Sequence, residues 1–83
     1  MASVRDQISE MLYNAVSVAM NKSVAELSDS TQLVADLGAK SANLVRIISA
    51  VEDELDLDVS YQEFGRRKTL GEIIDYLVEL HES

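Results

Sequence analysis

Asp36-Leu37-Gly38-Ala39-Lys40-Ser41 leads directly into a run of apolar residues at helical spacing, from Ala42 to Leu55. Gly38 suits the last bend of a loop that enters a helix, because glycine tolerates backbone angles that other residues avoid. The side chains of one helical face then recur at steps of four, three and four residues: Leu44, Ile48, Val51 and Leu55. Val45 and Ile47 widen this apolar stripe. The pattern predicts an amphipathic helix packed on a core.

We expect this helix to run from Ser41 to about Leu55, which places Ser41 in its first turn or at its cap. Unpaired backbone N–H groups and the positive end of the helix dipole gather there, and they favour an anion attached to the serine oxygen. The only histidine, His81, lies at the far end of the chain, so the sequence shows no general base beside Ser41. Ser41 is therefore predicted to be a weak nucleophile but a well-placed acceptor for modification by another enzyme.

Composition excludes several classes of function. The 83 residues include 15 acidic and 7 basic side chains, and the net charge of −8 argues against nucleic-acid binding, which takes a basic face. The lack of cysteine leaves no disulfide and no thiolate metal site. No stretch is long and apolar enough for membrane insertion, and the first residues lack the apolar core of a secretory signal. We therefore expect one domain over residues 1–83, in the cytoplasm, without a metal.

The first part of the chain predicts a long helix followed by a long connection. Apolar spacing indicates a helix from about Val4 to Met20, capped by Ser3 and with the hydroxyl of Tyr13 in water at the edge of its stripe. The connection from Asn21 to Lys40 is long for a compact domain. Within it, Ser23-x-x-Glu26 is typical of a capping box that starts a short helical turn.

Two further capping boxes divide the last part of the chain. Ser60-x-x-Glu63 predicts a short helix from Tyr61 to about Gly65, and Thr69-x-x-Glu72 begins a final helix with its own apolar stripe. The sequence therefore predicts an all-α fold, a small four-helix bundle. Its elements are a long helix, a long loop, a second helix, a short third helix and a fourth helix.

A basic run, Arg66-Arg67-Lys68, separates the two last helices. Three charges are too few for a nucleic-acid patch on so acidic a chain. We expect these side chains to balance Asp56 and Asp58 within the molecule.

Asp36-Leu37-Gly38-x-x-Ser41 resembles the attachment motif of acyl carrier proteins, whose usual form is Asp-x-Gly-x-Asp-Ser-Leu. The resemblance covers nearly the whole chain, since the order of elements is also similar and Thr69 matches the threonine that starts the family's last helix. It implies that Ser41 receives 4′-phosphopantetheine from coenzyme A through a separate phosphopantetheinyl transferase. The thiol of that arm then carries acyl groups as thioesters, and the chain itself is not an enzyme.

The resemblance also implies partners. Acyl-processing enzymes with basic patches dock on the family's second helix, and Glu52, Asp53 and Glu54 make the end of that helix acidic here. The attached acyl chain is shielded in an apolar gap between helices, for which the candidate lining residues are Leu44, Ile48, Phe64 and Ile73. The carrier is expected to be a monomer.

Two positions depart from the family pattern: Lys40 replaces the acid before the serine, and Ala42 replaces the leucine after it. One hypothesis is that Lys40 neutralises the phosphodiester; the other is that Lys40 suits a different set of partners, which would make this a specialised carrier. Fatty-acid, polyketide, lipid-modification and aminoacyl pathways stay open. An alternative is an unmodified protein-interaction module in which Ser41 is only a helix cap. An enzyme ranks third, because no acid, base and nucleophile converge in the sequence.

Overall fold

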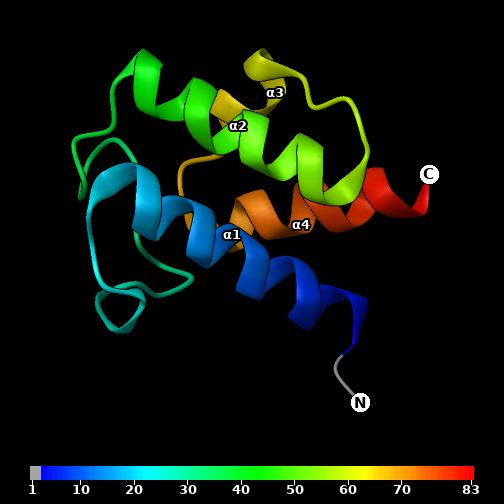
Figure 1. Cartoon of the computed structure of the whole chain (residues 1–83), viewed down its shortest axis with the longest axis horizontal. Coiled ribbons are helices and arrows are strands. Elements are labelled where there is room, and N and C mark those ends of the chain that lie inside the picture. The colour runs from blue at the N-terminus through cyan, green and yellow to red at the C-terminus, as the bar shows by residue number, and fades with distance from the viewer. Residues whose placement is uncertain (1–2) are drawn as a thin grey trace.

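Helices form most of residues 3–83, which are the residues that the computed structural model describes. The elements, in chain order, are α1 (Val4–Met20), the 3-10 turn η1 (Val24–Glu26), α2 (Ser41–Leu55), α3 (Tyr61–Arg66) and α4 (Leu70–Glu82). Figure 1 shows α1 and α2 side by side in opposite directions, with α4 behind them. The all-α bundle with a long first loop and a short third helix is confirmed.

Two of the three predicted capping boxes form as expected, and the predicted Ser3 cap forms a complete box as well. At the start of α1 the Ser3 hydroxyl accepts a hydrogen bond from the backbone N–H of Asp6, and the Asp6 carboxylate accepts one from the N–H of Ser3. Ser23-x-x-Glu26 at η1 and Thr69-x-x-Glu72 at α4 make the same reciprocal pair. Because each box satisfies backbone donors that a helix start would leave unpaired, these local motifs fix where the helices begin.

The box predicted at α3 forms only in part. The Ser60 hydroxyl accepts a hydrogen bond from the N–H of Glu63 at 3.2 Å, but the N–H of Ser60 donates instead to the hydroxyl of Tyr76, at 3.3 Å. α3 ends at Arg66, one residue after the predicted end, and Gly65 is not the residue that ends it, since it has no positive φ. The start of α3 is therefore held by α4 as well as by its own sequence.

The core lies where α1 meets α2 and α4. The side chains that are almost completely buried come from all four α-helices: Ile8, Leu12, Val16, Ile47, Val51, Phe64, Leu70, Ile73, Ile74 and Leu77. Val45, which was predicted to widen the apolar stripe of α2, is 52% exposed, whereas Ile47 is fully buried. The buried face of α2 is therefore displaced to one side of the predicted stripe.

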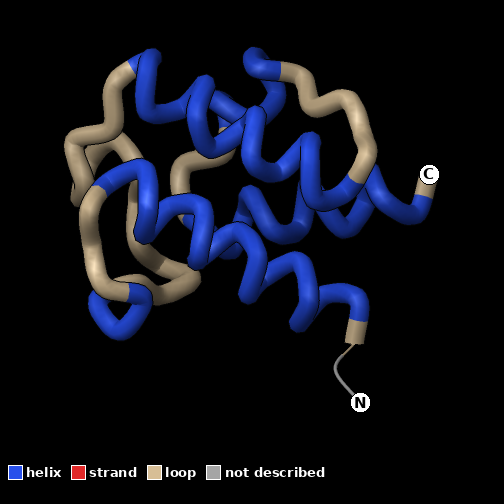
Figure 2. Tube along the Cα trace, in the orientation of Figure 1, coloured by secondary structure: helices blue, strands red, loops and turns tan. Residues whose placement is uncertain are grey.

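The long connection packs back on the start of α4 (Figure 2). Gln32 and Thr69 form an isolated antiparallel bridge, in which the N–H of Leu33 donates to the carbonyl of Lys68 at 3.3 Å. The N–H of Leu70 donates to the carbonyl of Thr31 at 3.0 Å. The loop that precedes α2 is thus anchored to a segment more than thirty residues away in the sequence.

Asp29 is a second anchor of this loop. Its carboxylate accepts a hydrogen bond from the Tyr13 hydroxyl, and its carbonyl accepts one from the N–H of Gly71 at 2.9 Å. Partial burial, followed by the bond to Asp29, raises the pKa of Tyr13 to about 12. The hydroxyl, which was predicted to lie in water at the edge of the apolar stripe, remains near the surface and takes Asp29 as a partner.

Candidate functional site

Ser41 is the first residue of α2, and its side chain is exposed. Lys40 occupies the cap position, with extended backbone angles, so the sequence-based choice between first turn and cap is resolved in favour of the first turn. The side chain of Asn43 accepts a hydrogen bond from the N–H of Lys40 at 2.8 Å. The amide nitrogen of Asn43 also reaches the carbonyl of Ala19, at 3.5 Å, and so joins the start of α2 to the end of α1.

The loop before Ser41 is closed by its own backbone. The N–H of Gly38 donates to Val34, and the N–H of Ala39 donates to Leu33, each at 3.0 Å. The carboxylate of Asp36 accepts a hydrogen bond from the N–H of Gln32 at 2.8 Å. Asp36 therefore has a structural role in closing the turn that presents Ser41.

The backbone conformation at position 38 requires a glycine. Its φ is +69°, in the left-handed region that residues with a Cβ rarely adopt, and no atom lies within 4 Å of where a Cβ would be. Because the space is open, the constraint at this position is conformational rather than steric crowding. The predicted last bend before the helix is confirmed.

The charge around Ser41 differs from that at the other helix starts. Asp6, Glu26, Glu63 and Glu72 lie in the first turns of the other described helices, but the first turn of α2 has no acidic residue. Lys40 stands directly before it. Free N–H groups, the dipole and this lysine all favour an anion on Ser41, so the residues present fit a phosphate ester there.

A cavity of about 320 Å³ lies between the loop and α3, beside the first turn of α2. Its apolar walls include Leu33, Leu44 and Phe64, and Leu44 is the residue three positions after Ser41. Two of the four residues predicted to shield an acyl chain therefore line the cavity. Ile48 and Ile73 do not line it; they are buried in the core, at 6% and 0% exposure.

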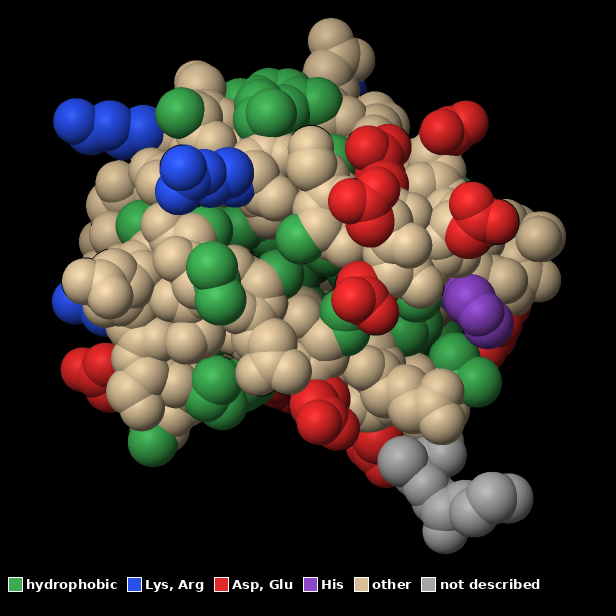
Figure 3. All heavy atoms as spheres, viewed as in Figure 1, with side chains coloured by type: hydrophobic (Ala, Val, Ile, Leu, Met, Phe, Trp, Pro, Cys, Tyr) green, Lys and Arg blue, Asp and Glu red, His purple; other side chains and the backbone are tan. Residues whose placement is uncertain are grey.

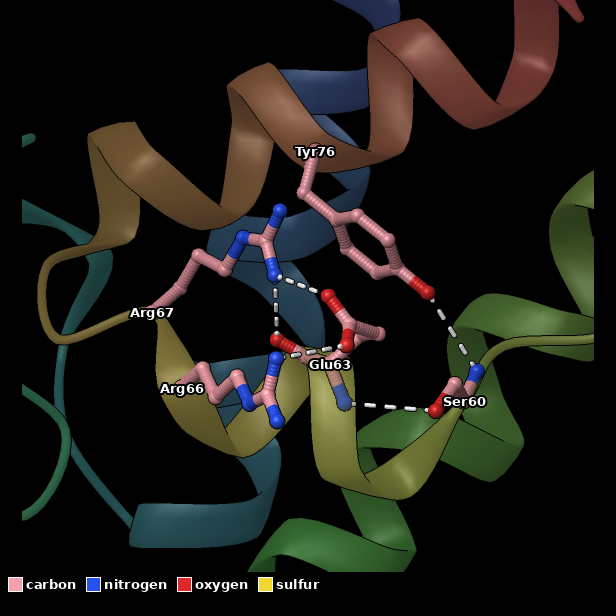
Figure 4. Close-up of polar contacts among 5 residues, drawn as sticks. All are labelled: Ser60, Glu63, Arg66, Arg67 and Tyr76. Carbon is pink, nitrogen blue, oxygen red and sulfur yellow. Dashed lines mark hydrogen bonds and ion pairs between the residues drawn. The ribbon is translucent and has the colours of Figure 1, made fainter.

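The basic run between α3 and α4 pairs with Glu63 (Figure 4). Arg66 and Arg67 contact the two carboxylate oxygens of Glu63 at 3.1 and 2.8 Å. The hydrogen bond from Arg67, followed by the charge of Arg66, holds the pKa of Glu63 below its ordinary value. The expectation that these arginines balance Asp56 and Asp58 is wrong, because the i+3 and i+4 spacing along α3 brings both to Glu63.

Arg67 also contacts α4. Its guanidinium lies 4.5 Å from the centre of the Tyr76 ring, in cation–π geometry. The hydroxyl of the same tyrosine accepts the hydrogen bond from Ser60 described above, so α3 is held at both ends (Figure 4). The sequence did not predict Tyr76 or Asn43 as site-supporting residues, since their partners lie 16 and 24 residues away.

Two kinds of site are not found in the described part of the chain. Among residues 3–83, no group of three or more His, Asp or Glu side chains is arranged to hold a metal ion. None of the helices in this range combines the length and hydropathy that a bilayer span needs.

Comparison with known proteins identifies the family. The family model described as "Phosphopantetheine attachment site" matches residues 10–77, which include Ser41 and every α-helix except the ends of α1 and α4. The chain belongs to the acyl carrier protein family. Its cofactor is 4′-phosphopantetheine, and this carrier is not itself an enzyme.

Curated relatives cover nearly all of this carrier. It is similar to the acyl carrier protein of Clostridium perfringens (strain 13 / Type A), with 28% identity over 74 residues, 89% of this chain and 92% of the relative. It is also similar to the acyl carrier protein of Rickettsia typhi, with 29% identity over 77 residues, 93% of this chain and 90% of the relative. A carrier domain of this kind interacts with acyl-processing enzymes and with acyl chains.

Proposed function

We propose that Ser41 is the attachment residue for 4′-phosphopantetheine, and that the arm holds acyl intermediates as thioesters in fatty acid, polyketide or specialised lipid biosynthesis. One observation carries the proposal: Ser41 is the exposed first residue of α2, and the capping position belongs to Lys40. The serine hydroxyl is therefore available at the helix end that best accommodates a phosphate. The family match over residues 10–77 supports this assignment.

Attachment needs chemistry that this chain does not supply. The Ser41 oxygen would form a bond to the phosphorus that carries the pantetheine of coenzyme A, with 3′,5′-ADP as the leaving group. The hydroxyl proton would pass to a base of the phosphopantetheinyl transferase, because His81 stands at the end of α4, far along the chain from Ser41. The free N–H groups at the start of α2 and the Lys40 side chain would then neutralise the phosphodiester.

We further propose that acyl-processing enzymes dock on α2 through its acidic end. Asp53 and Glu54 are exposed there, whereas Glu52 is partly used within the molecule, because its carboxylate accepts a hydrogen bond from the N–H of Val59 at 2.8 Å. The acids available to a basic partner are therefore Asp53 and Glu54, with Asp56 and Asp58 just beyond. The net charge of −8 favours basic partners and a monomeric carrier.

A single domain over residues 1–83 and a cytoplasmic location stay predictions.

Intact-mass measurement tests the site. The carrier would be incubated with coenzyme A and a broad-specificity phosphopantetheinyl transferase, in parallel with Ser41→Ala and with Ser49→Ala. Ser49 is a matched control, since it is an exposed serine of the same helix, two turns from the start. We expect one phosphopantetheine to be added to the unaltered chain and to Ser49→Ala, and none to Ser41→Ala.

The alternative, an unmodified interaction module, assumes that Ser41 only caps the helix. Because Lys40 is the cap residue and Asn43 satisfies its N–H, that role is not needed. A mass that stays unchanged with transferases from the same source as the carrier would contradict the proposed attachment and favour the unmodified module.

A further inference from the structure

A groove runs between α1 and α2, on the side of α2 away from the cavity near Ser41. It has a volume of about 780 Å³ and is lined only by residues of α1 and α2. The cavity near Ser41, in contrast, is lined by the loop, α3 and Leu44. The two hollows therefore use different neighbours of α2, and an occupant of the groove would leave the Ser41 side open.

The lining of the groove suits close contact with another helix. Ala15 and Ala19 of α1 and Ala50 of α2 are small residues, so the backbone of an approaching helix can come near. At one side stands Val18, which is 81% exposed, more than any other exposed large hydrophobic residue in the described chain. Nothing in the bundle itself buries this valine.

The two ends of the groove carry opposite charge. Because α1 and α2 are antiparallel, Glu10 and Glu54 lie at one end and Arg46 at the other (Figure 1). Arg46 and Glu54 are separated by eight residues of α2, which is roughly 12 Å at the helical rise. None of the three takes part in an ion pair within residues 3–83. Figure 3 shows this face, with most acidic side chains to the right and basic ones to the left of an apolar hollow.

We propose that this groove binds one amphipathic helix of a partner protein, parallel to α1. The helix would place its apolar stripe over Ala15, Ala19 and Ala50, a basic side chain of its first turn beside Glu10 and Glu54, and an acidic side chain of its last turn beside Arg46. The dipole of the partner helix favours the same direction, because its positive N-terminus then meets the two glutamates. A partner held there leaves the Ser41 side open, but it shares Glu54 with enzymes that dock on the acidic end of α2.

The charge of the chain argues for a different protein rather than a second copy. Each copy carries −8, so two copies would repel one another, whereas a helix with a cationic first turn is attracted to the glutamate end. A second copy is therefore an outcome to be checked by light scattering of the free carrier. The proposal does not depend on modification of Ser41.

Two synthetic helical peptides of identical composition test the orientation. Each has 14 residues, a leucine stripe, an acetylated N-terminus and an amidated C-terminus; one carries two lysines in its first turn and two glutamates in its last, and the other has these charges exchanged. Binding is followed by amide chemical shifts of the ¹⁵N-labelled carrier. We expect the first peptide to bind at least tenfold more tightly and to shift the amides of Ala15, Ala19 and Ala50. The exchanged peptide, with glutamates in its first turn and lysines in its last, forms the more stable isolated helix. Helix stability alone would therefore favour the exchanged peptide, which is the opposite of the expected result.

Variants of the carrier complete the test. The double variant Arg46→Glu with Glu54→Arg should reverse the preference between the two peptides, and peptide helicity cannot cause such a reversal. Val18→Lys should weaken binding at least tenfold, whereas Val34→Lys, at a valine that is 62% exposed outside the groove, should not. Equal binding of both peptides, no binding at millimolar concentration, shifts confined to the α3 side, or a dimer of the free carrier that covers the groove would each overturn the proposal.

Discussion

The guanidinium of Arg67 lies over the ring of Tyr76, 4.5 Å from its centre, and this contact joins the end of α3 to α4. The same arginine donates to the carbonyl of Glu63 at 2.9 Å and to its carboxylate at 2.8 Å. With six residues, α3 is too short to be stable alone. Its position over the cavity near Ser41 therefore depends on contacts with α2 and α4, and Arg67 is itself part of the cavity wall.

Substitutions at Tyr76 separate the roles of its hydroxyl and its ring. Tyr76→Phe removes the acceptor for the N–H of Ser60 but keeps the ring under Arg67, so we expect a loss of about 0.5–1 kcal/mol in the free energy of unfolding. Tyr76→Ala also removes the ring and should cost more. Urea denaturation measures both losses, and hydrogen exchange at the Ser60 amide should quicken in each variant. If Tyr76→Phe costs as much as Tyr76→Ala, the contact with Arg67 does not contribute.

Partial burial of the Tyr13 hydroxyl, together with its hydrogen bond to Asp29, makes stability depend on pH in the alkaline range. The folded pKa of Tyr13 is about 12 against an ordinary 10.0, so its stabilising effect is complete below pH 10 and is lost as the pH rises through 12. Tyr13→Phe should cost about 1 kcal/mol at pH 7. It should also lose less stability than the unaltered carrier between pH 10 and pH 12. Denaturation curves at these pH values provide the measurement, and a parallel decline of both proteins would contradict the assignment.

Replacement of glycine by alanine should lower stability at Gly38 and raise it at Gly65. Gly38→Ala forces a Cβ into the left-handed region at φ +69°, which we expect to cost about 1–2 kcal/mol although the space is open. Gly65→Ala lies inside α3, also with open space, and should stabilise by roughly 0.5–1 kcal/mol through helix propensity. Thermal unfolding compares the two, and Gly38→Asn serves as a control because asparagine tolerates this conformation. Destabilisation by Gly65→Ala would show that α3 is strained.

Lys40 should affect the modified form of the carrier more than the unmodified form. Lys40→Glu places a negative charge beside the proposed phosphodiester, so the ³¹P resonance of the modified protein should shift. Lys40→Gln should shift it less, since it removes the charge without reversing it. Identical ³¹P spectra for the unaltered and Lys40→Glu proteins would mean that the lysine does not reach the phosphate.

Local patterns in the sequence determined most of the bundle. Apolar spacing set α1, α2 and α4, and the boxes at Ser3, Ser23 and Thr69 set where three helical segments begin. Gly38 and the run after it placed Ser41 at the start of α2. These features depend on residues only a few positions apart, so the chain encodes them without reference to the rest of the fold.

Tertiary structure alone decided the polar contacts between elements and which apolar residues line a hollow. Arg67 lies over the ring of Tyr76, the hydroxyl of Tyr76 accepts from Ser60, and the loop bridges from Gln32 to Thr69. Such contacts join residues distant in sequence, and helical spacing carries no information about them. The same reason explains why Val45 is exposed and why Ile48 is buried in the core rather than lining the cavity: neighbouring helices, not the period, choose the buried face.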